Sequence, residues 1–189
     1  MIETAKLIQQ FVRTLNERGL EPLFDREVPP ELRGKQLSDI SGMYEWRICS
    51  SEENPWVSPL EEKLPFRFPP LYHELISGYR FAEFEIGPIM FLANTGTAVF
   101  NELADVMFRD RNLSPTLMKN GLLQFGRQAG GGYDPICFDM KRRVKDDAPV
   151  VRIDHEDVLI RNRLRVLPEI APTFERFVEQ VIAGRQSTR

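Results

Sequence analysis

The middle of the chain carries three short apolar runs, LLQFG, PICFDM and PVVRID, between residues 122 and 154. Two stretches with turn character separate them, the glycine-rich RQAGGGYD and the charged KRRVKDDA. Short apolar runs bounded by such stretches are typical of successive strands joined by turns. They predict a sheet at the centre of the fold, and they raise the question of what the glycines do.

A phosphate-binding loop would give the glycines a catalytic meaning, and the sequence argues against it. Aligning Gly126 and Gly131 with the Walker pattern puts Gly132 where the lysine belongs and Tyr133 where the hydroxyl belongs. The loop should also open a helix, whereas Pro135 begins an apolar run typical of a strand. Glycine readily adopts the positive φ angles of tight turns, so a hairpin is predicted instead.

The rest of the chain predicts helices around this sheet. Ile8, Phe11, Val12 and Leu15 repeat at helical spacing, so residues 2–18 are expected to form an amphipathic helix. Further helices are predicted at residues 59–64, from the prolines at 69–70 to Gly78, at 97–108, from Ser114 and at 168–182, and a helical turn is predicted at 155–162. Additional strands are expected at residues 42–48 and on both sides of Gly87-Pro88. Strands grouped centrally, with helices around them, predict an α+β fold with a mixed or antiparallel sheet.

Composition limits the functional classes. The 25 basic and 28 acidic side chains give a net charge of −3, which provides no overall attraction to nucleic acid or anionic membranes. Cys49 and Cys137 form no CxxC pattern, so a reducing compartment is expected. The N-terminus lacks signal-peptide character, and no apolar stretch could span a bilayer. We expect a cytoplasmic protein.

The candidate chemical groups have simple structural explanations. The cluster IDHEDV, residues 153–158, is better explained as a capped turn between a strand and a helix than as a metal site. A nucleophile pair of Cys137 and His155 is formally available, but Cys137 lies within an apolar run and is expected to be buried. We therefore predict no catalytic set, metal or cofactor, and keep a hydrolase using Cys137 or His155 as an alternative.

Two basic stretches, KRRVK at 141–145 and RNRLR at 161–165, could contact nucleic acid. Asp146 and Asp147 follow the first immediately, and neither stretch lies on a basic face with interleaved aromatic residues. Nucleic-acid binding is therefore a weak alternative.

The order of segments from Trp56 to Ile182 resembles the SUKH superfamily, which includes fungal regulators of cell-wall assembly and bacterial immunity proteins of polymorphic toxin systems. Five motifs carry this resemblance: an LP-containing entry, a helix of the Pro-x-x-Tyr type, a glycine-rich turn leading to a strand that ends in Asp, a strand followed by His-Glu, and a closing Ala-x-x-Phe-x-x-Phe helix. The matching residues are Leu64, Pro65, Pro70, Tyr72, Gly131, Gly132, Phe138, Asp139, residues 150–156, Ala171, Phe174 and Phe177.

The resemblance implies a SUKH-like domain at residues 46–189, preceded by a helix and connector at 1–45. It also implies a non-enzymatic domain that binds a protein partner, first of all an immunity protein that neutralises a cognate toxin. A regulatory scaffold of the cell-wall type is the alternative. An acidic contact face would suit a nuclease toxin, whose own surface is basic. The expected contact residues lie near the turns of the sheet: Tyr133, Asp134, Asp139, His155, Glu156 and Asp157.

Overall fold

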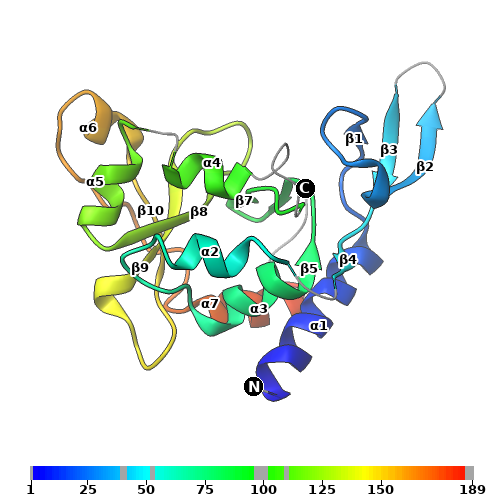
Figure 1. The fold of residues 1–189 in the computed structure, drawn as a ribbon, viewed down its shortest axis with the longest axis horizontal. Helices are drawn as coiled ribbons and strands as arrows, with labels where there is room; N and C mark the ends of the chain where they lie inside the picture. Colours follow the sequence, from blue (N-terminus) through cyan, green and yellow to red (C-terminus); the bar gives the residue numbers. More distant parts are fainter. Residues whose placement is uncertain (1, 39–41, 52–53, 96–101, 109–110, 186–189) are drawn as a thin grey trace.

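The computed structural model describes residues 2–38, 42–51, 54–95, 102–108 and 111–185 (Figure 1). Its centre is a five-stranded sheet in which strands adjacent in sequence are adjacent in space. The strands are β6 (Phe84–Ile86), β7 (Ile89–Phe91), β8 (Leu122–Gln128), β9 (Pro135–Asp139) and β10 (Val150–Arg152). Each pairs antiparallel with the next, which confirms the predicted α+β class and the antiparallel form of its sheet.

The glycine-rich stretch is the hairpin between β8 and β9. The Gln128 N–H donates to the Asp134 carbonyl at 2.8 Å, and Gly130 and Gly131 have φ angles of 74° and 77°. Gly126 has a different role, because it lies within β8 beside β7. A Cβ atom there would be 2.7 Å from the Met90 carbonyl oxygen, so this glycine permits two strands to approach closely.

Helices cover the sheet and build a large aromatic core. α1 (Ile2–Arg18) packs against α3 (Pro70–Gly78) and α7 (Phe174–Ile182), while α2 (Val57–Glu61) packs on α3 (Figure 1). The rings of Phe125 and Phe138 stack at 4.1 Å between centroids, and Phe174 meets both edge-on. Tyr72 is fully buried among them, and its hydroxyl makes no hydrogen bond to a described residue. Burial raises the Tyr72 pKa far above its usual value.

A smaller core lies on the other face of the sheet. Cys137 belongs to it, whereas its strand neighbours Ile136 and Phe138 face the large core, as alternation along a strand requires. α4 (Glu102–Phe108) and α5 (Ser114–Lys119) follow β7 and pack on β8, and α5 also contributes to the smaller core. α6 (His155–Leu159) follows β10 and covers this core with Val158.

The N-terminal segment is attached through the large core. Its three-stranded sheet has the order β1 (Leu23–Phe24), β3 (Met43–Trp46), β2 (Arg33–Ser38), and lies beside the main sheet (Figure 1). A short helical turn, η1 (Pro30–Leu32), precedes β2. β4 (Cys49–Ser50) then pairs with β5 (Tyr79–Arg80), while a second turn, η2 (Met140–Arg142), follows β9.

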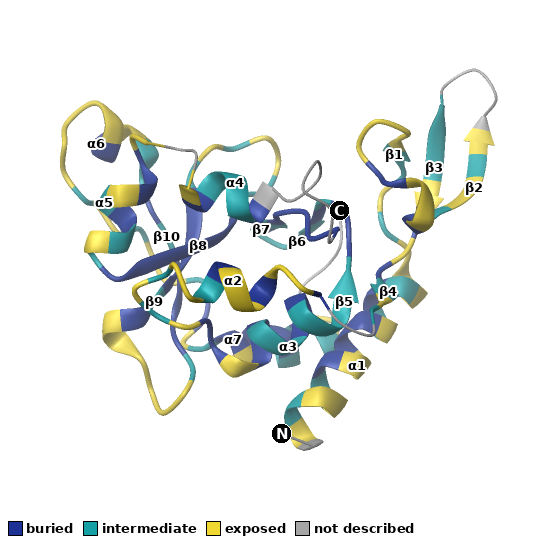
Figure 2. Cartoon of the chain, viewed as in Figure 1, coloured by how far each residue is buried: buried dark blue, intermediate teal, exposed yellow. Residues whose placement is uncertain are grey.

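The helix predicted at residues 2–18 is confirmed, and its apolar face is part of the same core as the sheet. Phe11 and Leu15 have no exposed surface, and Trp46 packs 6.3 Å from the Phe84 ring. Figure 2 shows this buried face of α1 against the main body. The division into residues 1–45 and 46–189 stays a prediction. Because the two parts share a core, the folding of a truncated chain can test it.

Candidate functional site

The IDHEDV cluster is a capped turn that begins α6. The Asp154 carboxylate accepts the Asp157 N–H at 3.0 Å, which is the bond that an N-cap residue makes. Within the described ranges, no group of three or more His, Cys, Asp or Glu side chains is arranged to hold a metal ion. The cap interpretation is confirmed.

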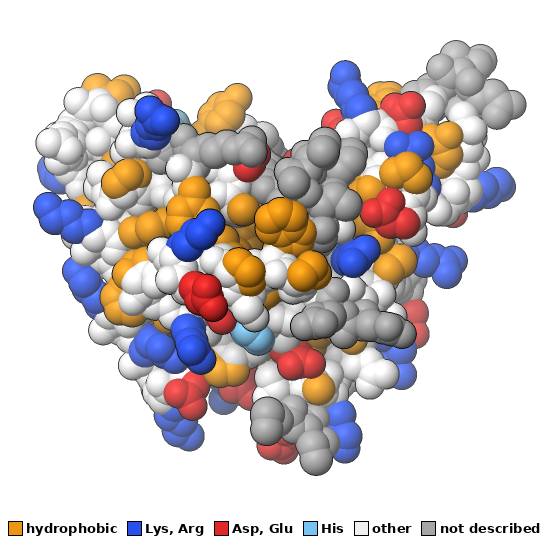
Figure 3. Space-filling view, viewed as in Figure 1, with side chains coloured by type: hydrophobic (Ala, Val, Ile, Leu, Met, Phe, Trp, Pro, Cys, Tyr) orange, Lys and Arg blue, Asp and Glu red, His pale blue; other side chains and the backbone are white. Residues whose placement is uncertain are grey.

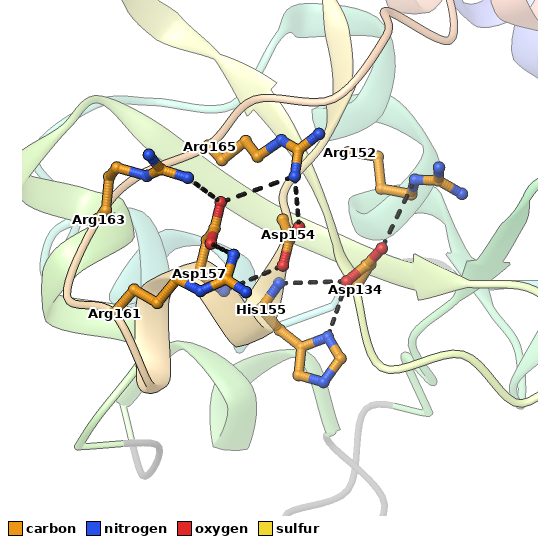
Figure 4. Close-up of polar contacts among 8 residues, drawn as sticks. All are labelled: Asp134, Arg152, Asp154, His155, Asp157, Arg161, Arg163 and Arg165. Atoms are coloured by element: carbon orange, nitrogen blue, oxygen red, sulfur yellow. Dashed lines mark hydrogen bonds and ion pairs between the residues drawn. The ribbon is translucent and has the colours of Figure 1, made fainter.

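Asp157 lies among three arginines (Figure 4). Its carboxylate has no exposed surface, contacts Arg161 Nη1, and lies 2.9 Å from Arg163 Nη2 and 3.9 Å from Arg165 Nη1. The hydrogen bond from Arg163 and that from Arg161 hold the pKa of Asp157 below its ordinary value, although loss of hydration opposes this. A buried carboxylate thus holds the guanidinium groups of Arg161 and Arg163 by hydrogen bonds, and together with Asp154 it forms ion pairs with Arg165. The three arginine side chains are nevertheless 55–65% exposed.

The backbone explains how three arginines reach one carboxylate. We call residues 160–166 the arginine loop; it leaves α6 and returns alongside β10. The Arg163 N–H donates to the Asp157 carbonyl at 2.9 Å, and Val166 forms an antiparallel bridge with Ile153. Leu164 packs on the smaller core, so Arg163 and Arg165 on either side of it face outward.

A second carboxylate joins the β8–β9 hairpin to the start of α6. Asp134 Oδ1 lies 2.7 Å from His155 Nδ1 and also accepts the His155 N–H at 3.1 Å, while Oδ2 is 3.6 Å from Arg152 Nε (Figure 4). The Tyr133 ring is 6.0 Å from the His155 ring and its residue is 74% exposed. The hairpin therefore contributes an exposed aromatic side chain next to α6.

The structure brings five of the six predicted contact residues together. Tyr133, Asp134, His155, Glu156 and Asp157 occupy the hairpin and α6, and among them Tyr133 and Glu156 are exposed. Asp139 is at the other end of β9, where it caps η2 and pairs with Arg142 at 2.7 Å. Because Asp157 is fully buried, it supports this surface from below and does not form part of it.

Apart from Tyr133, the outer layer consists of residues that were not among the expected contact residues. An acidic face was expected, but Asp134, Asp154 and Asp157 are turned inward and the arginines lie outside them. Apolar side chains accompany the arginines, with Ile160 78% and Leu159 51% exposed. We call this the α6 surface. It comprises Tyr133, Leu159, Ile160, Arg161, Arg163 and Arg165.

Apolar side chains also gather over α2 and α4, as the space-filling view shows (Figure 3). Trp56 and Phe108 are each 41% exposed there, and Lys63 Nζ lies 6.0 Å from the Phe108 ring centre. Contact surfaces of proteins are enriched in arginine together with aromatic and apolar residues. The α6 surface has this combination with its arginines held in place, and it is therefore the better candidate.

The suggested nucleophile pair receives no support from its geometry. Cys137 is fully buried in the smaller core, and burial together with the negative charge of Asp139 raises the pKa of its thiol well above the usual value. Among the described residues, the hydrogen-bonding and ion-pair contacts of the His155 ring involve Asp134 and no cysteine or serine. An Asp–His pair can orient a catalytic base, but within the described ranges no hydrogen bond or ion pair joins the His155 ring to a nucleophile.

Comparison with known proteins agrees with this fold. The model of the SMI1 / KNR4 family (SUKH-1) matches residues 51–180, a segment that runs from the end of β4 into α7 and includes the five-stranded sheet and the α6 surface. No match was found among curated proteins or solved structures. None of the helices within the described ranges has the length and apolar content that a bilayer span requires. The chain belongs to the SMI1 / KNR4 family, SUKH-1.

Proposed function

We propose that this chain is a protein-binding domain that acts without catalysis, and specifically an immunity protein that neutralises a cognate toxin by covering it. One observation carries the proposal. On the α6 surface, arginines held by the buried Asp157 follow the strongly exposed Ile160 in the chain, and the exposed Tyr133 lies next to His155 at the start of α6. Exposed apolar side chains and ordered arginines are the usual anchors of a protein interface.

The domain acts in the cytoplasm, where the toxin would otherwise reach its target. Both cysteines are free in the structure, in keeping with a reducing compartment. A regulatory scaffold of the cell-wall type would use the same kind of surface. The identity of the partner distinguishes the two roles.

The test is a pull-down of the tagged protein from its native host at native expression level, read by mass spectrometry. If the chain is an immunity protein, the pull-down recovers one stoichiometric partner with a toxin domain. Co-expression of the chain then protects cells from that toxin. Recovery of cell-wall or signalling proteins instead would favour the scaffold and overturn the immunity role.

A parallel experiment separates binding from catalysis. Cys137→Ala and His155→Ala should each keep the recovered partner and the protection, because neither side chain performs chemistry in this proposal. Loss of protection with partner binding intact would instead revive the hydrolase alternative.

A further inference from the structure

The guanidinium groups of the α6 surface have more hydrogen-bond donors than their contacts with Asp157 use. Each guanidinium carries five N–H donors, and the contacts with Asp157 use Nη1 of Arg161, Nη2 of Arg163 and Nη1 of Arg165. The side chains are more than half exposed, so their remaining donors are available to a partner. Because these arginine side chains are already held in position, less conformational entropy is lost when they bind a partner.

The charges are arranged in two layers. The carboxylates of Asp157, Asp154 and Asp134 form the inner layer, with side-chain exposures of 0%, 23% and 16%. The arginines form the outer layer, with Glu156 as the exposed acid next to them. A molecule that approaches the surface meets guanidinium groups first, and guanidinium pairs best with carboxylate or phosphate.

The neighbouring apolar side chains decide between these two anions. Ile160 is 78% exposed, and Leu159 precedes it with 51% exposure. The phosphate backbone of a nucleic acid has no apolar recess in which an isoleucine side chain could be buried. Protein interfaces bury such side chains in apolar recesses surrounded by polar groups. The net charge of −3 also opposes general attraction to nucleic acid.

We propose that the α6 surface binds an acidic protein surface, in which carboxylates surround an apolar recess that receives Ile160. This inference rests on the proposed protein-binding function and states what chemistry the partner must present. A toxin bound in this way would contribute carboxylates to the interface, the opposite of the basic nuclease surface expected from the sequence.

The test uses short peptides as probes and the complete isotope-labelled chain as receptor, followed by NMR. The first probe is acetyl-EELLEE-amide, which combines carboxylates with an apolar centre. Acetyl-KKLLKK-amide keeps the apolar centre and reverses the charge, and acetyl-EEGGEE-amide keeps the charge without the apolar centre. An oligothymidylate represents nucleic acid. We expect the first probe to shift the backbone amides of residues 155–166 and the Arg163 side-chain signal most strongly.

Two variants and two matched controls locate the binding. Arg163→Gln and Ile160→Glu should each weaken binding of the first probe by about ten-fold or more, since each removes one anchor of the surface. Arg176, on α7, is 67% exposed, and Val144 is 58% exposed in another loop. Arg176→Gln and Val144→Glu should therefore leave binding within about two-fold of the original chain. Ile160 is 78% exposed, so Ile160→Glu should leave the fold intact and remains informative if Arg163→Gln disturbs it.

The outcomes separate this inference from the proposed function. Equal binding of the lysine peptide, tighter binding of oligothymidylate, or no shift at α6 with any probe would overturn the acidic-partner inference. The pull-down could still recover a toxin in each of those cases, bound through another face. Conversely, binding of the first probe at α6 combined with recovery of no toxin would overturn the immunity role alone.

Discussion

The Asp157 carboxylate has no exposed surface, yet it lies 2.9 Å from Nη2 of Arg163, whose side chain is 65% exposed. A buried negative charge therefore holds an exposed positive one. The pair ties the arginine loop to α6 at the site where we place the partner. Breaking it should loosen the surface before it unfolds the domain.

Replacing Asp157 with Asn tests this role directly. Asparagine keeps the shape but loses the charge, so its hydrogen bonds with Arg161 and Arg163 are weaker and its ion pair with Arg165 is lost. We expect faster amide hydrogen exchange in residues 155–166, with the five-stranded sheet unchanged. Asp146 has an 88% exposed side chain near Arg143, so Asp146→Asn is the control and should leave exchange as it is. Unchanged exchange in Asp157→Asn would contradict the anchoring role.

Acid should release the same loop. The Arg163 hydrogen bond lowers the pKa of folded Asp157 below the unfolded value of about 3.9, so the charged form stabilises the fold above that pH. This contribution is lost as the pH falls through the lower, folded-state pKa. The protection of residues 155–166, measured relative to the intrinsic exchange rate at each pH, should therefore fall in acid more steeply in the original chain than in Asp157→Asn, in which the group cannot titrate. Parallel pH profiles for the two proteins would show that another group controls the loop.

Gly126 and Gly78 should respond in opposite ways to alanine. At Gly126 the new Cβ would lie 2.7 Å from the Met90 carbonyl oxygen and 3.1 Å from Ile89, so β7 and β8 must separate. We expect a loss of about 1–3 kcal/mol in the free energy of unfolding, measured with denaturant. At Gly78, the last residue of α3, a Cβ meets nothing within 4 Å. Gly78→Ala should be neutral or stabilise by about 0.4–1 kcal/mol. Equal effects at the two positions would contradict this assignment of close approach.

The hydroxyl of Tyr72 should be dispensable for stability. It is buried in the aromatic core and makes no hydrogen bond to a described residue, so its removal relieves a polar group that is costly to bury. Tyr72→Phe should leave the melting temperature unchanged or raise it. Tyr72→Ala, which removes the ring, should cost about 3–5 kcal/mol. A clear loss of stability in Tyr72→Phe would mean that the hydroxyl has a partner in solution.

The N-terminal helix should be required for folding, although it lies outside the matched residues 51–180. Phe11 is fully buried in the main core, and Phe11→Ala should cost about 3–5 kcal/mol. Arg13 is 69% exposed on the same helix, and Arg13→Ala should change stability by less than about 0.5 kcal/mol. The fragment 46–189 should be unfolded by circular dichroism. A cooperative thermal transition in that fragment would instead establish the boundary predicted after residue 45.

Much of the fold was predictable because its periodicities are strong. The helix predicted at 2–18 is α1, since its apolar residues repeat along one buried face. β2 was missed because RGKQLS is polar and forms a strand only through pairing with β3. α2 was placed two residues late, at Pro59, because proline can occupy any position of the first turn and does not mark the first residue.

The site was predicted less completely, for a physical reason. Asp134 and His155 are 21 residues apart, and only the antiparallel pairing of β9 with β10 brings them together. The arginines had a usable signal, because residues 161, 163 and 165 alternate around Leu164 as on a strand with one buried face. Their common contact with Asp157 follows from the loop geometry, which spacing alone does not reveal.

The packing of α1 against α7 also sets the order of events during synthesis. Arg18 Nη2 donates to the Val181 carbonyl at 2.6 Å across a separation of 163 residues. At about 5–20 residues per second, a ribosome needs roughly 8–33 seconds to make the intervening chain. Throughout that time the apolar face of α1 lacks one of its final neighbours. The apolar face of this helix is therefore open to aggregation, or to a chaperone, until α7 has been made.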